Sequence, residues 1–452
     1  MDSGFGLGGL SKSIAEMTTS KLDYWSPFII ENGVRKSHDI EIRPQSISVD
    51  GPIEFHLSAD PEKFTDISSL TLRGKVGVRV KNNGVWKPVS EIDPTPDSWG
   101  VINNFYQSLF SSVIVKVNDC EIGDISNSSY PYTSYIQTLL GTSASQSGNH
   151  ILAERGFIKD DPAHMEEANP GRSHAYRERR KNLINNNFVD FNIPIHNDIV
   201  TAEKYLPPDT KLSIVIRRSS DEFLIWKTDA DTLEYKIVLD DMHLNVKRLE
   251  VSPGVLKNHQ KELKDAGLLK IKYTQNVMKS FAVPSGSVEL KQHNLFFGNR
   301  LPNRLYLAFV EQSAYNGDAL KNPFNFVTAG MKDAAIVVNG ISEPNPPYTF
   351  EPDIDERDLY FSFLENTGTS PFEMDSVNVS FEEFKNGYFI LPFDRSPTKD
   401  NGLYTHKSDA GSITVKVRTR YPIQKNFMVL VFASYDSCLV FAEDKVITEH
   451  IY

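Results

Sequence analysis

Cysteine is scarce in this sequence, with only Cys120 and Cys438 among 452 residues. Two thiols this far apart do not form a disulfide framework or a zinc site. A reducing compartment is the simpler interpretation, so the protein is expected to be made in the reducing interior of a cell. The glycosylation sequons at Asn127 and Asn378 are then expected to be unused.

Long apolar segments are missing as well. No stretch of about 20 apolar residues occurs, so no transmembrane helix and no stable membrane insertion are expected. The start Met1-Asp2-Ser3-Gly4 lacks the basic and apolar regions of a signal peptide. These observations argue against a membrane-spanning or secreted protein.

Positive charge is in deficit, because 48 Lys and Arg residues face 59 Asp and Glu residues and leave a net charge of −11. A protein that binds nucleic acid along much of its surface needs a basic excess to neutralise phosphates. The chain as a whole therefore does not have the composition of a nucleic-acid-binding protein. An acidic balance instead helps to keep an abundant protein soluble.

Catalytic and metal-binding motifs are also lacking. The sequence contains no Gly-x-Ser-x-Gly elbow, no Walker loop and no His-Glu-x-x-His. Its 11 histidines are scattered, and a metal site at His164 and His174, in an acidic loop, is left only as a minor alternative. The carboxylates of Asp240 and Asp241 are neighbours on a predicted strand and point to opposite faces. We therefore expect no enzyme activity, no catalytic residues, no metal and no cofactor.

Aromatic residues are abundant, at 11% of the chain with 27 Phe and 18 Tyr, and they favour strands. Residues 70–80 alternate apolar and polar side chains with period two, which predicts a half-buried strand. Similar short runs recur along the chain, separated by turn pairs such as Asn83-Gly84. This pattern predicts an all-β sandwich or barrel. Short helices are expected at 132–140 and at 253–267, the latter capped by Ser252 and closed by Gly267.

The second half of the sequence repeats the first in the same order. Each half ends in what reads as a pair of apolar strands. The matched segments are 70–80 with 304–310, 113–119 with 335–340, 191–196 with 389–394, 212–217 with 413–418, and 235–251 with 427–447. Two copies of one β domain are therefore expected, and the first carries extra loop within 141–187. The predicted division is a flexible arm at 1–20, a first barrel at 21–252, a helical linker at 253–268 and a second barrel at 269–452.

One basic cluster stands out in the extra loop of the first copy. Its members are Arg172, Arg177, Arg179, Arg180 and Lys181. The functional interpretation is contact with nucleic acid or with an acidic neighbouring subunit. The alternative is a solvated helix or loop, balanced by nearby glutamates.

Several distinctive blocks occur along the chain: SLFSSV at 108–113, YPYTSYIQTLL at 130–140, FAVPSG at 281–286, NLFFGNRLP at 294–302, YNG at 315–317, NPFNF at 322–326 and NGYF at 386–389. In this order they resemble blocks of the major capsid proteins of Polinton (Maverick) elements. The resemblance runs from about residue 24 to the C-terminus. The loop at 141–187 matches no block of that family.

The resemblance implies a double jelly roll, meaning two tandem eight-stranded sandwiches, in a capsid protein related to those of virophages and adenovirus-like viruses. It also implies a homotrimer with a pseudo-hexagonal outline that builds an icosahedral shell around double-stranded DNA. The expected partners are other copies of the chain, penton and minor capsid proteins, and the DNA at most indirectly. Two alternatives stay open: a jelly-roll carbohydrate-binding module or enzyme, and a capsid-derived protein domesticated by a host.

Overall fold

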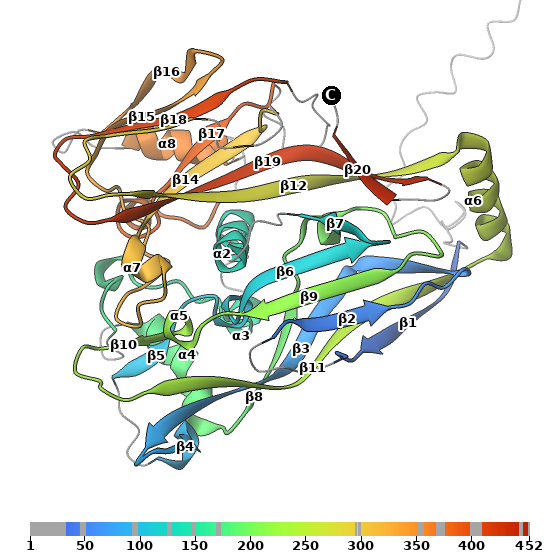
Figure 1. Ribbon diagram of the computed structural model, residues 1–452, viewed down its shortest axis with the longest axis horizontal. Coiled ribbons are helices and arrows are strands. Elements are labelled where there is room, and N and C mark those ends of the chain that lie inside the picture. The colour runs from blue at the N-terminus through green and yellow to red at the C-terminus, as the bar shows by residue number, and fades with distance from the viewer. Residues whose placement is uncertain are drawn as a thin grey trace, which may run out of the picture.

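A computed structural model provides the coordinates of the chain (Figure 1). It describes residues 33–45, 51–92, 98–123, 129–146, 150–168, 173–293, 296, 300–350, 357–367, 376–397, 409–442 and 446–450. The predicted arm at 1–20 and Arg172 lie outside these residues.

The first half of the chain forms two facing antiparallel sheets. The first, here the β1 sheet, has the order β1-β11-β3-β8, and β4 extends it beside β3. The second, the β2 sheet, has the order β2-β9-β6-β7. Their strands are β1 (Val34–Ile42), β2 (Ile53–Leu57), β3 (Lys63–Asn82), β4 (Val85–Pro88), β6 (Phe110–Val117), β7 (Cys120–Ile122), β8 (Val189–Pro194), β9 (Leu212–Arg218) and β11 (Tyr235–Val251).

The second half repeats the four paired strands β1-β11-β3-β8 and the four strands β2-β9-β6-β7. The β12 sheet has the order β12-β19-β14-β17, with β20 also paired to β19, and the β13 sheet has the order β13-β18-β15-β16. The strands are β12 (Leu268–Val283), β13 (Glu289–His293), β14 (Arg304–Glu311), β15 (Met331–Val338), β16 (Ile341–Thr349), β17 (Ile390–Asp394), β18 (Ile413–Thr419), β19 (Phe427–Ala442) and β20 (Val446–His450).

The predicted internal duplication is therefore confirmed, since each matched pair of segments occupies the same position in its sheet. β3 corresponds to β14, β6 to β15, β8 to β17, β9 to β18 and β11 to β19. Even the hairpin turns agree. Asn118-Asp119 follows β6 and Asn339-Gly340 follows β15, and all four residues have positive φ, as tight two-residue hairpins require.

One detail of the prediction is wrong. The pair of strands expected at 235–251 is a single strand, β11. Its pairing with β3 shifts register between Asp240 and His243, where Asp241 has a φ of 47°. The interruption in the apolar pattern thus marks a β-bulge, which bends a strand without ending it.

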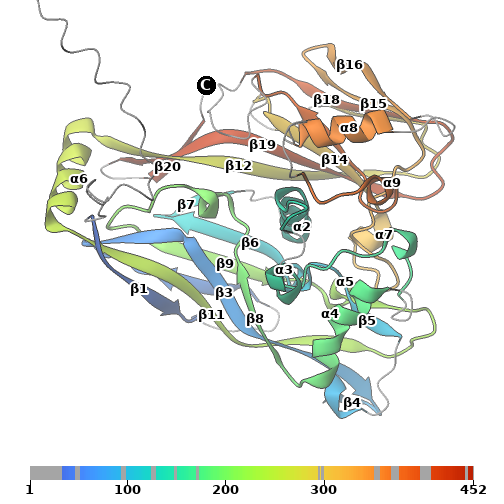
Figure 2. The same cartoon turned by 180° about the vertical axis from the view of Figure 1, so that it is seen from behind.

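Helices and short strands occupy the connections between the strands of the two barrels. They are η1 (Val89–Glu91), β5 (Trp99–Val101), α1 (Phe105–Ser108), α2 (Tyr130–Gly141), α3 (His150–Glu154), η2 (Pro162–His164), α4 (His174–Asn185), η3 (Asp198–Thr201), α5 (Asp221–Leu224), β10 (Ile225–Lys227), α7 (Gln312–Tyr315), α8 (Arg357–Asn366) and α9 (Phe381–Lys385). Both views place α2 between the two barrels (Figures 1 and 2).

The helix α6 (Pro253–Ala266) connects the two barrels at one end of the molecule (Figure 1). It ends as predicted, because Gly267 has a φ of 71° and its N–H donates to Leu263 O. Ser252 is the N-cap residue as predicted, but its side chain makes no capping hydrogen bond. The Ser252 backbone N–H donates to Gly33 O at 2.8 Å. Ser252 is thus tied to the chain just before β1.

The core follows the alternation seen in the sequence. Leu70, Leu72, Val76, Val78 and Val80 on β3 are each at most 2% exposed. Burial of large apolar side chains contributes about 1.5–3 kcal/mol each. The period-two pattern therefore identified the face of β3 that packs inside the first barrel.

Candidate functional site

The two barrels meet through sheets that are not counterparts of each other: the β2 sheet of the first barrel faces the β12 sheet of the second. On one side lie α2, η3 and β6 of the first barrel, and on the other lie β12 and β19 of the second (Figures 1 and 2). β19 is buried on both faces over most of its length, whereas β11, its counterpart, alternates buried and more exposed residues. The outer face of β19 is therefore covered by the first barrel. A cavity of about 260 Å³ remains between α2 and the strands β12, β14 and β19.

Aromatic rings from both barrels pack against one another at this junction. Tyr135 of α2 stacks on Phe324 with ring centroids 4.1 Å apart, and Tyr132 stacks on Tyr315 of α7 at 5.3 Å. Burial raises the pKa of both α2 phenols, so they are neutral. Such pairs contribute about 0.5–1.5 kcal/mol beyond the burial of their area. The cluster is the apolar centre of the contact between the barrels.

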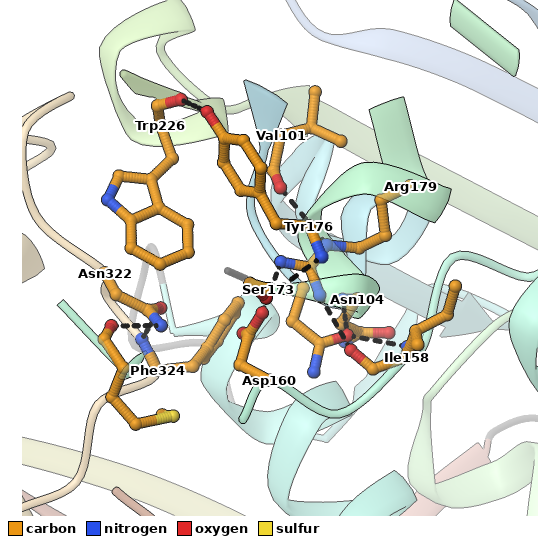
Figure 3. Close-up of polar contacts among 12 residues, drawn as sticks. Val101, Asn104, Ile158, Asp160, Ser173, Tyr176, Arg179, Trp226, Asn322 and Phe324 are labelled. Carbon is orange, nitrogen blue, oxygen red and sulfur yellow. Dashed lines mark hydrogen bonds and ion pairs between the residues drawn. The ribbon is translucent and has the colours of Figure 1, made fainter. Parts of the chain in front are cut away.

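Beside this cluster, Arg179 of α4 anchors the extra loop of the first barrel (Figure 3). Its Nη2 lies 2.6 Å from Asp160 Oδ1, its Nη1 donates to Ile158 O at 2.7 Å, and its Nε donates to Val101 O at 3.2 Å. Both charged side chains are almost fully buried, at 1% and 2% exposure. A desolvated ion pair is tolerated only with further hydrogen bonds, and the two carbonyls provide them for the guanidinium of Arg179.

The position of α4 is set by its first turn. Ser173 caps the helix by accepting a hydrogen bond from the Tyr176 N–H at 3.3 Å. The Tyr176 hydroxyl donates to Trp226 O at 2.9 Å (Figure 3). Its ring lies so close to Gly100 that a Cβ there would be 2.6 Å from it. Gly100 thus permits the approach that brings Arg179 to Asp160.

The same loop also makes polar contacts with the second barrel. The Tyr388 hydroxyl donates to Asp160 O at 2.8 Å, and Lys159 Nζ lies 2.6 Å from Glu383 Oε2 of α9. Gly387 has a φ of 92°, and a Cβ there would lie 2.4 Å from Met165 Cγ. The extra loop of the first barrel therefore contacts the second barrel at Lys159, Asp160 and Met165.

A second polar contact bridges the barrels at η3. Asn276 of β12 donates from its backbone N–H and from Nδ2 to the two carboxylate oxygens of Asp198, at 2.9 and 2.8 Å. Ser434 of β19 donates to Asn276 Oδ1 at 2.7 Å. Asp198 is 4% exposed, so this carboxylate is satisfied across the interface and ties the barrels together.

In the sequence, His196 lies just before the segment η3 that contains Asp198. Its Nδ1 is 3.0 Å from Gln137 Oε1 of α2, and its backbone N–H donates to the Tyr130 hydroxyl at 3.2 Å. Burial, helped by the charge of Arg155, lowers the pKa of His196 from 6.5 to about 4. The side chain is therefore neutral at physiological pH.

The predicted basic cluster is not one surface. Arg177 and Lys181 are exposed, with side chains 56% and 62% accessible. Arg179 and Arg180 are buried, with only 7% and 4% of each whole residue exposed, so within the chain neither presents a surface for nucleic acid or a neighbouring subunit. The expectation of surface contact is corrected for these two residues, because α4 turns them toward the loop and β5.

The described residues give no sign of the alternative sites. They contain no group of three or more His, Cys, Asp and Glu side chains placed to hold a metal. His164 lies 3.3 Å from Glu167, and His174 is exposed at the start of α4. Cys120 on β7 and Cys438 on β19 are not joined by a disulfide. Among the described helices, none is both long and apolar enough to cross a membrane.

We compared the sequence and the fold of the chain with those of known proteins. No family model matches the chain. It is 21% identical over 363 residues to the uncharacterized protein F54H12.2 of Caenorhabditis elegans, which covers 79% of this chain and 84% of that protein.

Solved structures resemble nearly the whole chain. A chain of the Sputnik virophage is 10% identical with a TM-score of 0.62, covering 97% of this chain and 93% of that one. The mavirus major capsid protein is 14% identical with a TM-score of 0.51, covering 96% and 93%. VP54 of PBCV-1 is 9% identical with a TM-score of 0.54, covering 94% and 98%. The expected all-β double jelly roll is confirmed, and the chain shares its fold with the Sputnik chain, the mavirus major capsid protein and VP54 of PBCV-1.

Proposed function

We propose that the chain is a major capsid protein whose homotrimers form an icosahedral shell around double-stranded DNA. Its role is structural, without catalysis or a cofactor. The observation that carries this proposal is the contact of unlike sheets between two barrels of the same topology. The fold shared with the mavirus major capsid protein supports it.

The geometry explains why three chains suffice. Within the chain, the β2 sheet of one barrel meets the β12 sheet of the next, so the β1 and β13 sheets lie on opposite outer sides (Figure 1). The β13 sheet is the counterpart of the β2 sheet, and the β1 sheet is the counterpart of the β12 sheet. A contact between the β13 sheet of one copy and the β1 sheet of the next repeats the internal contact. Head-to-tail contacts that close form rings, and six barrels in a ring come from three chains.

The division of the chain follows the same proposal. Residues 1–20 form an arm that ties a capsomer to its neighbours, 21–252 and 269–452 are the two barrels, and 253–268 link them. Deleting residues 1–20 is expected to leave the trimer intact and to impair assembly. Recovery of unchanged shells after the deletion would refute this role.

The proposed partners are further copies of the chain, penton and minor capsid proteins, and the genome at most indirectly. The net charge of −11 argues against extensive DNA contact. Among the described members of the basic cluster, Arg177 and Lys181 stay available for assembly contacts. The protein belongs in the virion capsid and is made in the reducing interior of the host cell.

Light scattering followed by electron microscopy of the same fractions tests the proposal. The expected species has a mass of about 153 kDa, three times the 51.0 kDa of the chain, together with particles that show hexagonally packed capsomers. Trimers that never assemble would favour a capsid-derived protein domesticated by a host. A stable monomer at every salt and protein concentration would refute the capsid proposal and favour a carbohydrate-binding module or enzyme.

A further inference from the structure

A second cavity opens in the second barrel, and Ser396 separates it from the cavity at the junction. It has a volume of about 500 Å³ and lies between β16, α8 and β17. Both views show α8 beside these strands and far from α6 (Figures 1 and 2). Small-molecule sites measure about 300–1,000 Å³, so the cavity is large enough for an organic ligand.

One wall of the cavity is a fixed aromatic ring. The Tyr348 hydroxyl donates to Pro392 O at 3.2 Å and accepts a hydrogen bond from Asn366 Nδ2 at 3.0 Å. Its ring packs against Phe393 with centroids 5.4 Å apart. Burial raises the pKa of Tyr348 to about 12, so the phenol is neutral. Contacts from β17 and α8 hold this ring of β16 in place before any ligand arrives.

The helix α8 presents a polar face to the cavity. Ser362, Glu365 and Asn366 line it and follow the i, i+3, i+4 spacing of one helix face. Leu359 and Phe363, on another face, are buried in the core. Within the described part of the chain, the Ser362 hydroxyl and the Glu365 carboxylate have no hydrogen-bond partner. A donor and acceptors for hydroxyl groups therefore face the cavity unpaired.

The charges select against anionic ligands. Arg395, the cation in the lining, is engaged by Glu343, with Nε 2.9 Å from Oε2. Asp394 is paired with Arg304 at 3.4 Å. Glu365 then leaves the wall with an unpaired negative charge, and a phosphate, sulfate or carboxylate placed there would be repelled.

We propose that this cavity binds a neutral saccharide. Ser362, Glu365 and Asn366 hydrogen-bond its hydroxyl groups, and the apolar face of the sugar packs on the aromatic wall of Tyr348 and Phe393. This combination of a few polar groups with an aromatic surface is how small ligand sites gain specificity. The site goes beyond a shell-forming role, because it allows the protein to carry or recognise a glycan.

Saturation-transfer NMR on the purified full-length protein, with D-glucose, D-galactose and N-acetyl-D-glucosamine as probes, tests the proposal. At least one of these sugars is expected to bind. Ser362→Trp fills the cavity and is expected to weaken binding by about tenfold or more. The matched control is Phe361→Trp on the same helix, because Phe361 does not line the cavity and is 53% exposed; it is expected to bind normally.

Glu365→Gln is a second variant that changes neither size nor burial. It is expected to weaken binding of the neutral sugar, with unchanged folding by circular dichroism. The proposal is overturned if none of the three sugars binds, if Ser362→Trp binds as well as the control, or if N-acetylneuraminic acid binds more tightly than the neutral sugars. These readouts do not depend on assembly, so they are independent of the capsid proposal.

Discussion

At the scale of single residues, Arg179 shows how a charge cluster divides once a helix forms. Arg177 and Lys181 are one turn apart on the exposed side of α4, whereas Tyr176, Arg179, Arg180 and Leu183 share its buried side. The spacing of these four residues is that of one helix face. The signal was therefore present in the sequence, but the charge of the two arginines concealed it.

Arg179→Met should cost about 3–5 kcal/mol of unfolding free energy, because it leaves the carboxylate of Asp160 buried without its partner. Urea unfolding followed by circular dichroism measures this loss. Arg177→Met is the matched control, since its side chain is 56% exposed, and a change within about 0.5 kcal/mol is expected. Equal stability of the two variants would contradict the assigned role of Arg179.

His196 makes the junction sensitive to acid. Because its pKa falls from 6.5 to about 4 on folding, the unfolded chain binds a proton between these pH values that the folded chain does not. The free energy of unfolding should therefore decrease as the pH drops from about 6.5 to about 4, by about 3 kcal/mol from this residue. Above pH 6.5 its contribution is constant.

The test compares urea unfolding of the wild type and His196→Gln at pH 7.5 and pH 4.5. Gln keeps a donor toward Gln137 but does not titrate, so the variant should lose about 2 kcal/mol less on acidification. If both proteins lose the same amount, other groups cause the acid sensitivity.

At the scale of elements, α2 and the loop after it hold the barrels together. The helix was expected from the apolar spacing of 132–140, and it forms at Tyr130–Gly141. Its location between the barrels was not predictable, because its partners Tyr315 and Phe324 are more than 170 positions away in sequence. Local periodicity specifies a helix and its apolar face but not the surface that covers this face.

Phe324→Ala tests whether α2 couples the barrels. Phe324 is fully buried, so its truncation should cost about 3–5 kcal/mol. Calorimetry should also show the unfolding transition broaden or divide in two as the barrels lose their common aromatic cluster. Phe361→Ala removes the same group from an exposed position and should leave one unchanged transition. A single sharp transition in Phe324→Ala would show that the cluster does not couple the barrels.

At the scale of the whole molecule, the proposed trimer depends on the outer face of the β13 sheet. Val337 of β15 is directly across from Thr414 of β18, and both point outward. This face resembles that of an ordinary solvated sheet, with ion pairs such as Arg418 with Asp333 at 2.8 Å.

Val337→Arg is expected to convert the trimer of about 153 kDa into a 51.0 kDa monomer with an unchanged melting temperature. A buried, unpaired charge at an interface costs several kcal/mol, whereas on the free monomer it is solvated. Leu263→Arg on α6 is the control, because α6 belongs to none of the sheets. A trimeric Val337→Arg protein would place the interface elsewhere.

The sequence by itself determined the strands, the turns and the duplication. These features depend on local chemistry: alternation specifies which face of a strand is buried, and Asn, Asp and Gly adopt the positive φ of tight turns. The order of the matched segments then implied two equivalent barrels. The blocks shared with a capsid family implied the double jelly roll that the structural comparisons bear out.

Only the tertiary structure decided which polar residues hold the extra loop and the two barrels together. Asp160, Asp198 and Asn276 look like ordinary surface residues in the sequence, yet their side chains are bonded to partners 19 to 158 positions away. The cavity beside α8 likewise arises where three separate segments converge. The physical reason is that the cost of burying a polar group depends on partners brought together by the fold, and no local pattern records those partners.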